Sequence, residues 1–312
     1  MNIAITGGTG FLGKYLVSAC QEMPQFAVRV LARPQEDAAQ VFGDSTEIIE
    51  TDYTLESLTE ALHGVDCIVH LAAQTMQRES DPLSVGAFMP VNVVLTENVF
   101  KSAVNAGVKK VIQMSSNNVY SKENKIPFSE AEEPKTSTVY GLSKLYAEQL
   151  GQFFARKTGL NIISLRLARL YGYGERDSVV FTRFMKLALK NKPLEIWGKG
   201  DTSIEYLYVR DCVEAIIETI KTSIPSDIYN LGSSESYSVL QLAQTINKIC
   251  NNEGNIIQDL SKAETGYDIL MDSSMFRKHT GWEVRWELEK AILEMYCLFG
   301  LEVNKKTDSH TT

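Results

Sequence analysis

Apolar and polar positions alternate along the first half of the chain as a regular succession of short apolar runs and amphipathic stretches. The apolar runs predict strands at residues 2–6, 26–32, 48–51, 65–72, 110–115 and 162–167. The stretches between them predict helices at residues 13–22, 55–63, 91–106 and 139–156. Strands that alternate with helices at this spacing form βαβ units, and their right-handed crossovers build a parallel sheet covered on both faces. The predicted fold class is therefore α/β, with a doubly wound parallel sheet.

The pattern becomes less regular beyond residue 171. It predicts helices at 179–191, 211–221, 239–250 and 288–299, with strands at 204–209 and 228–231. We interpret residues 1–170 as the main domain and residues 171–301 as a smaller α/β lobe, interleaved with the main domain and covering the carboxyl edge of its sheet. The polar segment 302–312 is predicted to be a disordered tail.

Composition excludes several classes of protein. The chain has 312 residues, of which 44% are hydrophobic and 22% charged, so it can bury a sizeable core. Its formal charge of −8 argues against nucleic acid as the main partner. We expect no membrane span, because the apolar runs fall short of the ~20 residues that a spanning helix needs. The first residues also lack the basic and apolar regions of a secretory signal.

The cysteines and histidines point to no metal or disulfide framework. The five cysteines are scattered and form no CxxC pair, which fits a reducing compartment, and we predict a cytoplasmic protein. The four histidines show no metal-ligand spacing, so we expect no metal site.

A glycine-rich loop follows the first predicted strand and opens a helix. Its sequence is TGGTGFLG at residues 6–13. Glycines at 7, 10 and 13 allow a sharp turn, a close approach to a pyrophosphate and tight packing of the helix on the sheet. The helix N-terminus then presents N–H groups and the positive end of its dipole to the phosphates. This context indicates a dinucleotide site, the alternative being a tight turn without a ligand.

The choice between NAD and NADP depends on the end of the second strand. An acid there binds the ribose 2′-hydroxyl of NAD, whereas an arginine accommodates the 2′-phosphate of NADP. This chain carries Arg33, which favours NADP without excluding NAD, unless Arg33 is only a solvated surface residue. Asp52, after the third strand, is placed to meet the adenine, and it can also cap the helix that begins near Thr54.

Tyr140 and Lys144 lie four residues apart in the first turns of the longest predicted helix, and so on one face of it. A phenol has a pKa near 10, and a neighbouring ammonium group lowers that pKa toward the range that general acid–base catalysis needs. Ser115 and Ser116 end the preceding strand, where a hydroxyl can bind a substrate oxygen or simply cap the strand end. We favour Ser116 as the catalytic hydroxyl, with Ser115 as the alternative.

Together these motifs resemble the extended short-chain dehydrogenase/reductase family, the NAD-dependent epimerase/dehydratase group. The matching segments are TGGTGFLG (6–13), HLAA (70–73), VNVVLTENV (91–99), SSNNVY (115–120), YGLSK (140–144), LRLARLYG (165–172), YLYVRD (206–211) and YNLGSSESYSVLQLA (229–243). They occur in the family's order over nearly the whole chain. The resemblance is specific for the family and much less specific for the substrate.

The resemblance implies a Rossmann core with a C-terminal substrate lobe, and a homodimer formed through helices 91–106 and 139–156. It implies that Ser116 orients the reacting oxygen, that Tyr140 exchanges a proton with it, and that Lys144 also holds the nicotinamide ribose. Asn92 is expected to brace the catalytic loop. The expected cofactor-binding residues are Gly7, Gly10, Phe11, Leu12, Gly13, Arg33, Asp52, Tyr53, Leu71, Ala72, Ala73, Asn92, Tyr140, Lys144 and Leu167.

The chain departs from the family pattern where relatives bind the substrate. Arg169 replaces a substrate-facing asparagine, and Ile204 replaces an arginine for the nucleotide diphosphate. Arg169 or Lys199 can supply the missing charge, although Arg169 can equally brace the lobe. Asn117 and Asn118 fill the positions where dehydratases carry Asp-Glu, which argues against dehydration. We take Ser116, Asn117 and Arg169 as the substrate-binding candidates.

These features favour a 4-epimerase that acts on C4 of a nucleotide-activated sugar. The alternative is an NADPH-dependent ketoreductase that acts on a keto-sugar or another small carbonyl compound, which Arg33 and the missing diphosphate arginine favour. A third hypothesis is a non-catalytic dinucleotide sensor, against which the presence of Ser116, Tyr140 and Lys144 counts. Fold alone does not distinguish these functions, because one fold serves many of them.

Overall fold

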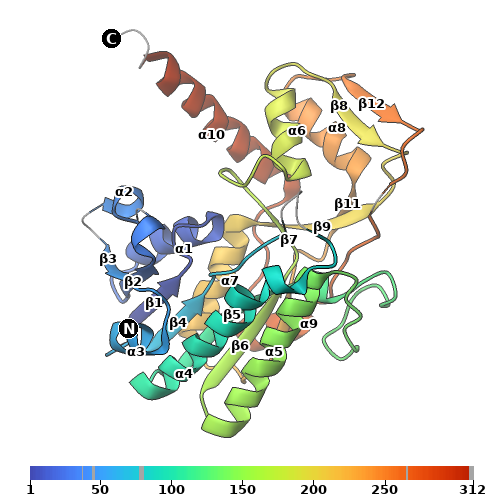
Figure 1. Cartoon of the computed structure of the whole chain (residues 1–312). Helices are drawn as coiled ribbons and strands as arrows, with labels where there is room; N and C mark the ends of the chain where they lie inside the picture. Colours follow the sequence, from blue (N-terminus) through green and yellow to red (C-terminus); the bar gives the residue numbers. More distant parts are fainter. Residues whose placement is uncertain (37, 44–45, 77–80, 265, 309–312) are drawn as a thin grey trace.

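The main sheet is built from parallel strands that alternate with helices along the chain. A computed structural model describes residues 1–36, 38–43, 46–76, 81–264 and 266–308 (Figure 1). Within them, seven strands lie in the order β10-β6-β5-β4-β1-β2-β3. Their bounds are β1 Asn2–Thr6, β2 Ala27–Ala32, β3 Glu47–Glu50, β4 Cys67–His70, β5 Lys110–Ser116, β6 Asn161–Leu167 and β10 Ile228–Leu231. The order reverses between β1 and β4, so the crevice at their carboxyl ends is the switch point where such sheets bind ligands.

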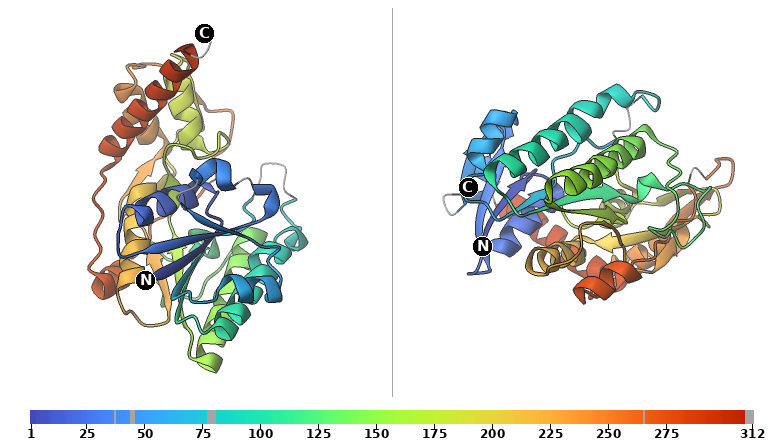
Figure 2. Two further views of the ribbon diagram at one scale, coloured as in Figure 1. Left: turned by 90° about the vertical axis from the view of Figure 1, so that its left-hand side faces the viewer. Right: turned by 90° about the horizontal axis from the view of Figure 1, so that it is seen from below.

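Helices cover both faces of this sheet (Figure 2). One face carries α3 (Leu55–Ala61), α4 (Thr96–Ala106) and α5 (Val139–Thr158). The other face carries α1 (Phe11–Gln21), α7 (Val209–Lys221) and α9 (Ser274–Thr280). The two faces have separate hydrophobic cores. Central strands such as β1 and β4 are buried along nearly their whole length, and most of their side chains are apolar.

The smaller lobe follows β6 and lies beyond the carboxyl end of the sheet (Figure 1). One of its sheets has the order β11-β9-β7, and a second pairs β12 with β8. Their bounds are β7 Arg169–Tyr171, β8 Leu194–Trp197, β9 Ser203–Tyr208, β11 Ser236–Ser238 and β12 Ile256–Asp259. The helices of the lobe are α6 Val180–Ala188, α8 Val239–Ile249 and α10 Leu288–Asp308. Short elements elsewhere are η1 Pro34–Glu36, α2 Ala38–Phe42, η3 Val85–Ala87, the π-helical turn η4 Met89–Leu95 and η5 Asn117–Val119.

The predicted α/β class with a doubly wound parallel sheet is confirmed. The chain does not stay in the lobe after residue 171, because α7, β10 and α9 return to the main sheet, where β10 pairs with β6. The predicted disordered tail is helical as far as Asp308, since each residue added to a formed helix gains one backbone hydrogen bond. Residues 309–312 lie outside the described residues. In the part of the chain that the structure describes, no helix has the length and apolar character to cross a bilayer.

Candidate active site

The glycine loop packs so tightly against neighbouring backbone that side chains have no room there. Gly7 has a φ of 67°, and a Cβ on it would lie 2.7 Å from the backbone nitrogen of Ala72. A Cβ on Gly13 would lie 2.3 Å from the carbonyl oxygen of Gly7. Gly10 is the N-cap of α1 and has no side chain to occupy the first-turn N–H groups of Phe11 and Leu12. No side chain therefore caps the N-terminus of α1, which is the kind of helix end that binds anions in proteins.

The two residues expected to meet the adenosine lie at the carboxyl ends of β2 and β3. Arg33 is exposed, and its guanidinium carbon lies 5.6 Å from the ring centroid of Tyr53. Asp52 is exposed and accepts hydrogen bonds from the N–H (3.0 Å) and hydroxyl (2.8 Å) of Thr54, which lower the pKa of its carboxyl. Thr54 itself is the N-cap of α3. Tyr53 is buried and donates its hydroxyl to the Leu31 carbonyl at 2.7 Å, so its phenol faces the protein.

A buried polar chain supports the loop that follows β4. His70 lies between the hydroxyls of Thr6 (2.7 Å from Nδ1) and Thr96 (3.0 Å from Nε2). Burial, and then the charge of Lys144, lowers the pKa of His70 to about 3, so the imidazole is neutral at physiological pH. The Thr6 hydroxyl also accepts from the N–H of Ala72 at 3.2 Å. This fixes Leu71, Ala72 and Ala73, all half-buried, beside the glycine loop.

Asn92 ties the same loop to the catalytic helix. Its side chain accepts from the N–H of Gln74 at 2.8 Å and donates to the carbonyl of Gln74 at 2.9 Å. It also donates to the Ser143 hydroxyl (2.9 Å), which in turn donates to the carbonyl of Tyr140 (2.7 Å). Asn92 is buried, and its side-chain amide forms its hydrogen bonds within the protein. It therefore braces the loop and does not itself face a ligand.

Ser116, Tyr140 and Lys144 come together at the carboxyl end of β5. Thr138 caps α5 by accepting from the N–H of Gly141 at 2.9 Å, which places Tyr140 in the first turn of the helix. Ser116 ends β5 and is buried, and its hydroxyl is near enough to the Tyr140 phenol to lower the pKa of that phenol. Lys144 is also buried, with its Nζ 6.0 Å from the ring centroid of Tyr140. The fold therefore brings together the hydroxyl of Ser116, the phenol of Tyr140 and the ammonium group of Lys144.

The electrostatics of the trio differ from the expectation that Lys144 lowers the pKa of Tyr140. Burial raises the pKa of Tyr140 to about 12, and the opposing effects come from the nearby Ser116 hydroxyl and the Arg176 charge. Lys144 instead donates to the Met114 carbonyl at 2.8 Å. Burial lowers the pKa of Lys144 to about 8, against the charge of Glu148. In this structure the ammonium group is directed at the strand and not at the phenol.

Comparison with known proteins gives the family. The model of the NAD dependent epimerase/dehydratase family matches residues 3–232. The chain belongs to this family. It is 31% identical to UDP-N-acetylglucosamine 4-epimerase from Bacillus cereus, with 96% of each chain covered and a TM-score of 0.85. It is 25% identical to UDP-glucose 4-epimerase from Thermotoga maritima, with 97% of this chain and 100% of that chain covered and a TM-score of 0.87. It is 27% identical to dTDP-4-dehydro-6-deoxyglucose reductase from Escherichia coli, covering 93% of this chain and 95% of the relative.

Membership of this NAD-dependent epimerase/dehydratase family makes the chain an enzyme of the extended short-chain dehydrogenase/reductase group. The candidate substrate residues lie at the carboxyl ends of β5 and β6. Asn117 is buried next to Ser116, and Leu167 is buried at the end of β6. Arg169 is exposed at the start of β7, and its charge lowers the pKa of Tyr206 and Tyr267.

Ile204 and Lys199, the other two positions at which the chain departs from the family pattern, differ in exposure. Ile204 is buried in β9, so no charge replaces the missing arginine at that position. Lys199 is exposed in the loop before β9.

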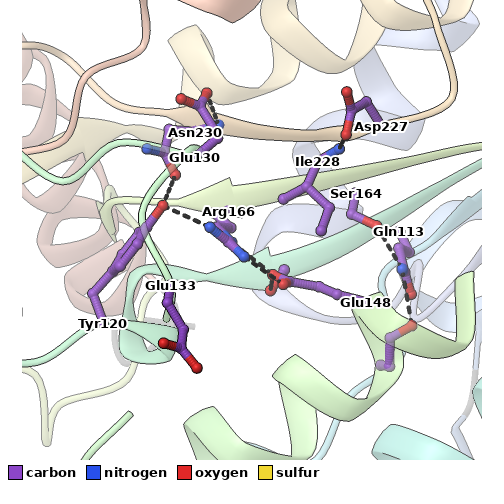
Figure 3. A network of polar contacts seen from close by, with 12 residues as sticks. Gln113, Tyr120, Glu130, Glu133, Glu148, Ser164, Arg166, Asp227, Ile228 and Asn230 are labelled. Atoms are coloured by element: carbon purple, nitrogen blue, oxygen red, sulfur yellow. Dashed lines mark hydrogen bonds and ion pairs between the residues drawn. The ribbon is translucent and has the colours of Figure 1, made fainter. Parts of the chain in front are cut away.

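A buried ion pair between Glu148 and Arg166 joins α5 to β6 (Figure 3). Glu148, two turns along α5 from Tyr140, receives two hydrogen bonds from Arg166 of β6, at 2.9 and 2.7 Å. Glu148 also accepts from Ser115, whose hydroxyl is therefore engaged in the core. Arg166 donates in addition to the Tyr120 hydroxyl at 2.6 Å. This arrangement favours Ser116 over Ser115 as the hydroxyl available to a substrate.

Sequence reasoning missed one cation near the site. Arg176, in the loop after β7, donates to the Thr75 hydroxyl at 3.0 Å and lowers the pKa of Tyr140 through its charge. A single arginine in a glycine-containing loop forms no sequence pattern from which such a contact could be predicted. The contact joins residues that are about a hundred positions apart, so only the tertiary structure reveals it.

Proposed function

We propose that this enzyme is a nucleotide-sugar 4-epimerase that uses Ser116, Tyr140 and Lys144. The observation that carries the proposal is the proximity of the Ser116 hydroxyl, the Tyr140 phenol and the buried Lys144 ammonium group at the carboxyl edge of the sheet. Two UDP-sugar 4-epimerases share the fold over nearly the whole chain, which supports a nucleotide sugar as substrate.

In this proposal the glycine loop and residues 71–73 would hold a dinucleotide, which when bound would supply reversible hydride transfer at C4. Ser116 donates a hydrogen bond to the C4 oxygen. Tyr140 removes the hydroxyl proton as the C4 hydrogen leaves with its electron pair, and returns that proton after the keto-sugar has turned its other face. Because burial raises the pKa of Tyr140 to about 12, the phenol needs the positive charges of its surroundings to act as a base near neutral pH.

The test is whether the enzyme converts UDP-N-acetylglucosamine or UDP-glucose to its 4-epimer. The conversion is monitored by nuclear magnetic resonance of the sugar protons. Tyr140→Phe keeps the ring and removes the proton-transfer group, so it should abolish conversion and leave dinucleotide binding intact. Stoichiometric NAD⁺ released on denaturation of the purified enzyme would support the epimerase. No epimer from either sugar, together with oxidation of NADPH by a keto-sugar, would refute it.

An NADPH-dependent ketoreductase is the second candidate function. It is supported by the position of Arg33 beside Tyr53 at the end of β2, and by the similarity to an Escherichia coli reductase of a keto-sugar nucleotide. A reductase exchanges its dinucleotide at every turnover, whereas an epimerase regenerates it. Comparing NADPH and NADH affinities in the wild type and in Arg33→Asp therefore distinguishes the two. A dinucleotide sensor, the third hypothesis, predicts that Tyr140→Phe has no functional consequence.

We further propose a homodimer formed through α4, α5 and the turn before α4. Large apolar side chains are exposed there: Val94 (49%), Val104 (40%), Leu142 (49%), Tyr146 (55%) and Phe153 (49%). Exposed apolar side chains gathered on neighbouring helices are typical of an interface. Light scattering of the wild type and of Phe153→Asp tests this: the proposal requires a dimer that the substitution weakens.

A further inference from the structure

Residues 172–176, here called the strap, run from α1 to the loop that follows β4. At the first end, Gly172 packs so closely that a Cβ on it would lie 3.1 Å from the ring of Phe11. The Tyr15 hydroxyl of α1 donates to the carbonyl of Tyr173 at 2.9 Å. Gly174, with a φ of 91°, then redirects the chain in a conformation that other residues rarely adopt. The strap is thus attached to the helix that opens the dinucleotide site.

The second end is fastened by a single side chain. The Nη1 atom of Arg176 donates to the Thr75 hydroxyl at 3.0 Å, and Nε lies 3.4 Å from the Glu175 carboxylate. Thr75 is a firm anchor, because Asn92 holds the neighbouring Gln74 by both its N–H and its carbonyl. Arg176 itself is 45% exposed, so this fastening can break without disturbing the core.

The two anchors belong to the two segments that bound the switch-point crevice. Phe11 and Tyr15 follow β1, and Thr75 follows β4, which is the neighbour of β1 in the sheet. A segment attached on both sides passes over the crevice between them. The dinucleotide that we propose for this crevice would therefore lie between the sheet edge and the strap.

We propose that the strap encloses the dinucleotide and that the contact between Arg176 and Thr75 is the fastening that must open before the dinucleotide leaves. This inference rests on the proposed dinucleotide site. It deepens the proposed function, because a dinucleotide that takes a hydride from one carbon and returns it must stay bound until the turnover is complete. A reductase has to open the fastening in every cycle.

The experiment measures dinucleotide release and not activity. Protein freed of co-purified nucleotide is loaded with NADH, or with NADPH if the wild type binds only that form. It is then mixed with a large excess of the oxidised nucleotide while the fluorescence of the bound reduced nucleotide decays. Arg176→Gln and Thr75→Val each remove one partner of the fastening, and Arg183→Gln, an exposed arginine of α6, is the charge-matched control.

Loss of one such hydrogen bond should speed release roughly three- to tenfold in each single variant. The double variant should be no faster than the singles, and the control should match the wild type. The proposed role of the contact would be refuted if Arg176→Gln left the release rate unchanged, or if release were faster in Arg176→Gln but not in Thr75→Val. Either result would leave the proposed function intact. A wild type that binds neither NADH nor NADPH would instead refute the proposed function.

Discussion

The ion pair between Glu148 and Arg166 provides a quantitative test of the core behind the active site. The Glu148 side chain is 0% exposed and that of Arg166 is 3% exposed, so removing either partner leaves an unpaired charge away from water. Glu148→Leu and Arg166→Met should each lower the free energy of unfolding by about 3–5 kcal/mol. The double variant replaces the pair with apolar side chains of similar size, so it should cost less than about 3 kcal/mol.

The assay is urea unfolding monitored by tryptophan fluorescence. The free energies of unfolding of the wild type, the two single variants and the double variant are combined in a double-mutant cycle. Glu97→Gln is the matched control, because Glu97 and Lys101 form an exposed pair at 2.6 Å. An exposed helix pair contributes only about 0.3–0.5 kcal/mol, and the control should change by no more than this. The reasoning would be refuted if the two core substitutions were additive, or if either cost as little as the control.

Further predictions concern the chemistry and the support of the site. Tyr140→Phe should reduce turnover by roughly 10²- to 10⁴-fold with dinucleotide binding unchanged, as titration calorimetry and a sugar assay will show; substantial residual turnover would contradict the assigned proton transfer. His70 has a pKa of about 3 in the folded protein, whereas an ordinary histidine has a pKa of 6.5. Between these two pH values the unfolded chain binds a proton that the folded protein does not. The free energy of unfolding should therefore fall by on the order of 4 kcal/mol as the pH drops from 6.5 to 3. His70→Asn should flatten this part of the stability profile measured by urea unfolding, and a variant as steep as the wild type would be evidence against it. Arg33→Asp should weaken NADPH binding relative to NADH at least tenfold if Arg33 contacts the 2′-phosphate, and equal losses for both nucleotides would make it a surface residue. Gly13→Ala should abolish dinucleotide binding and destabilise the fold, since its Cβ would lie 2.3 Å from a backbone oxygen, and an alanine variant that binds normally would show that the turn can relax.

The sequence predicts the main sheet well for a physical reason. Strands buried on both faces, such as β1 and β4, are mostly apolar, and that pattern can be recognised without a structure. The short lobe strands β8 and β12 were missed, because each has only four residues and their partners lie some sixty positions apart. Their existence is decided by pairing and not by local composition.

The candidate site was predicted in its parts but not in its electrostatics. Spacing places Tyr140 and Lys144 on one face of a helix, yet it cannot show that the Met114 carbonyl competes for the ammonium group at 2.8 Å. Likewise, Ser115 and Ser116 are equivalent in sequence, and only the tertiary contact of Ser115 with Glu148 separates their roles. Contacts between distant segments determine which of several suitable side chains faces the substrate.

The position of β10 has a consequence for how the protein is made. The strand Ile228–Leu231 leaves the ribosome long after β6, its only neighbour in the main sheet within the described residues. Until then the nascent chain carries β6 as an open, apolar edge, which is a template for wrong pairing with another chain. The lobe between the two strands must therefore be synthesised before the sheet can close, so truncation near residue 170 would produce an aggregation-prone fragment and not a smaller enzyme.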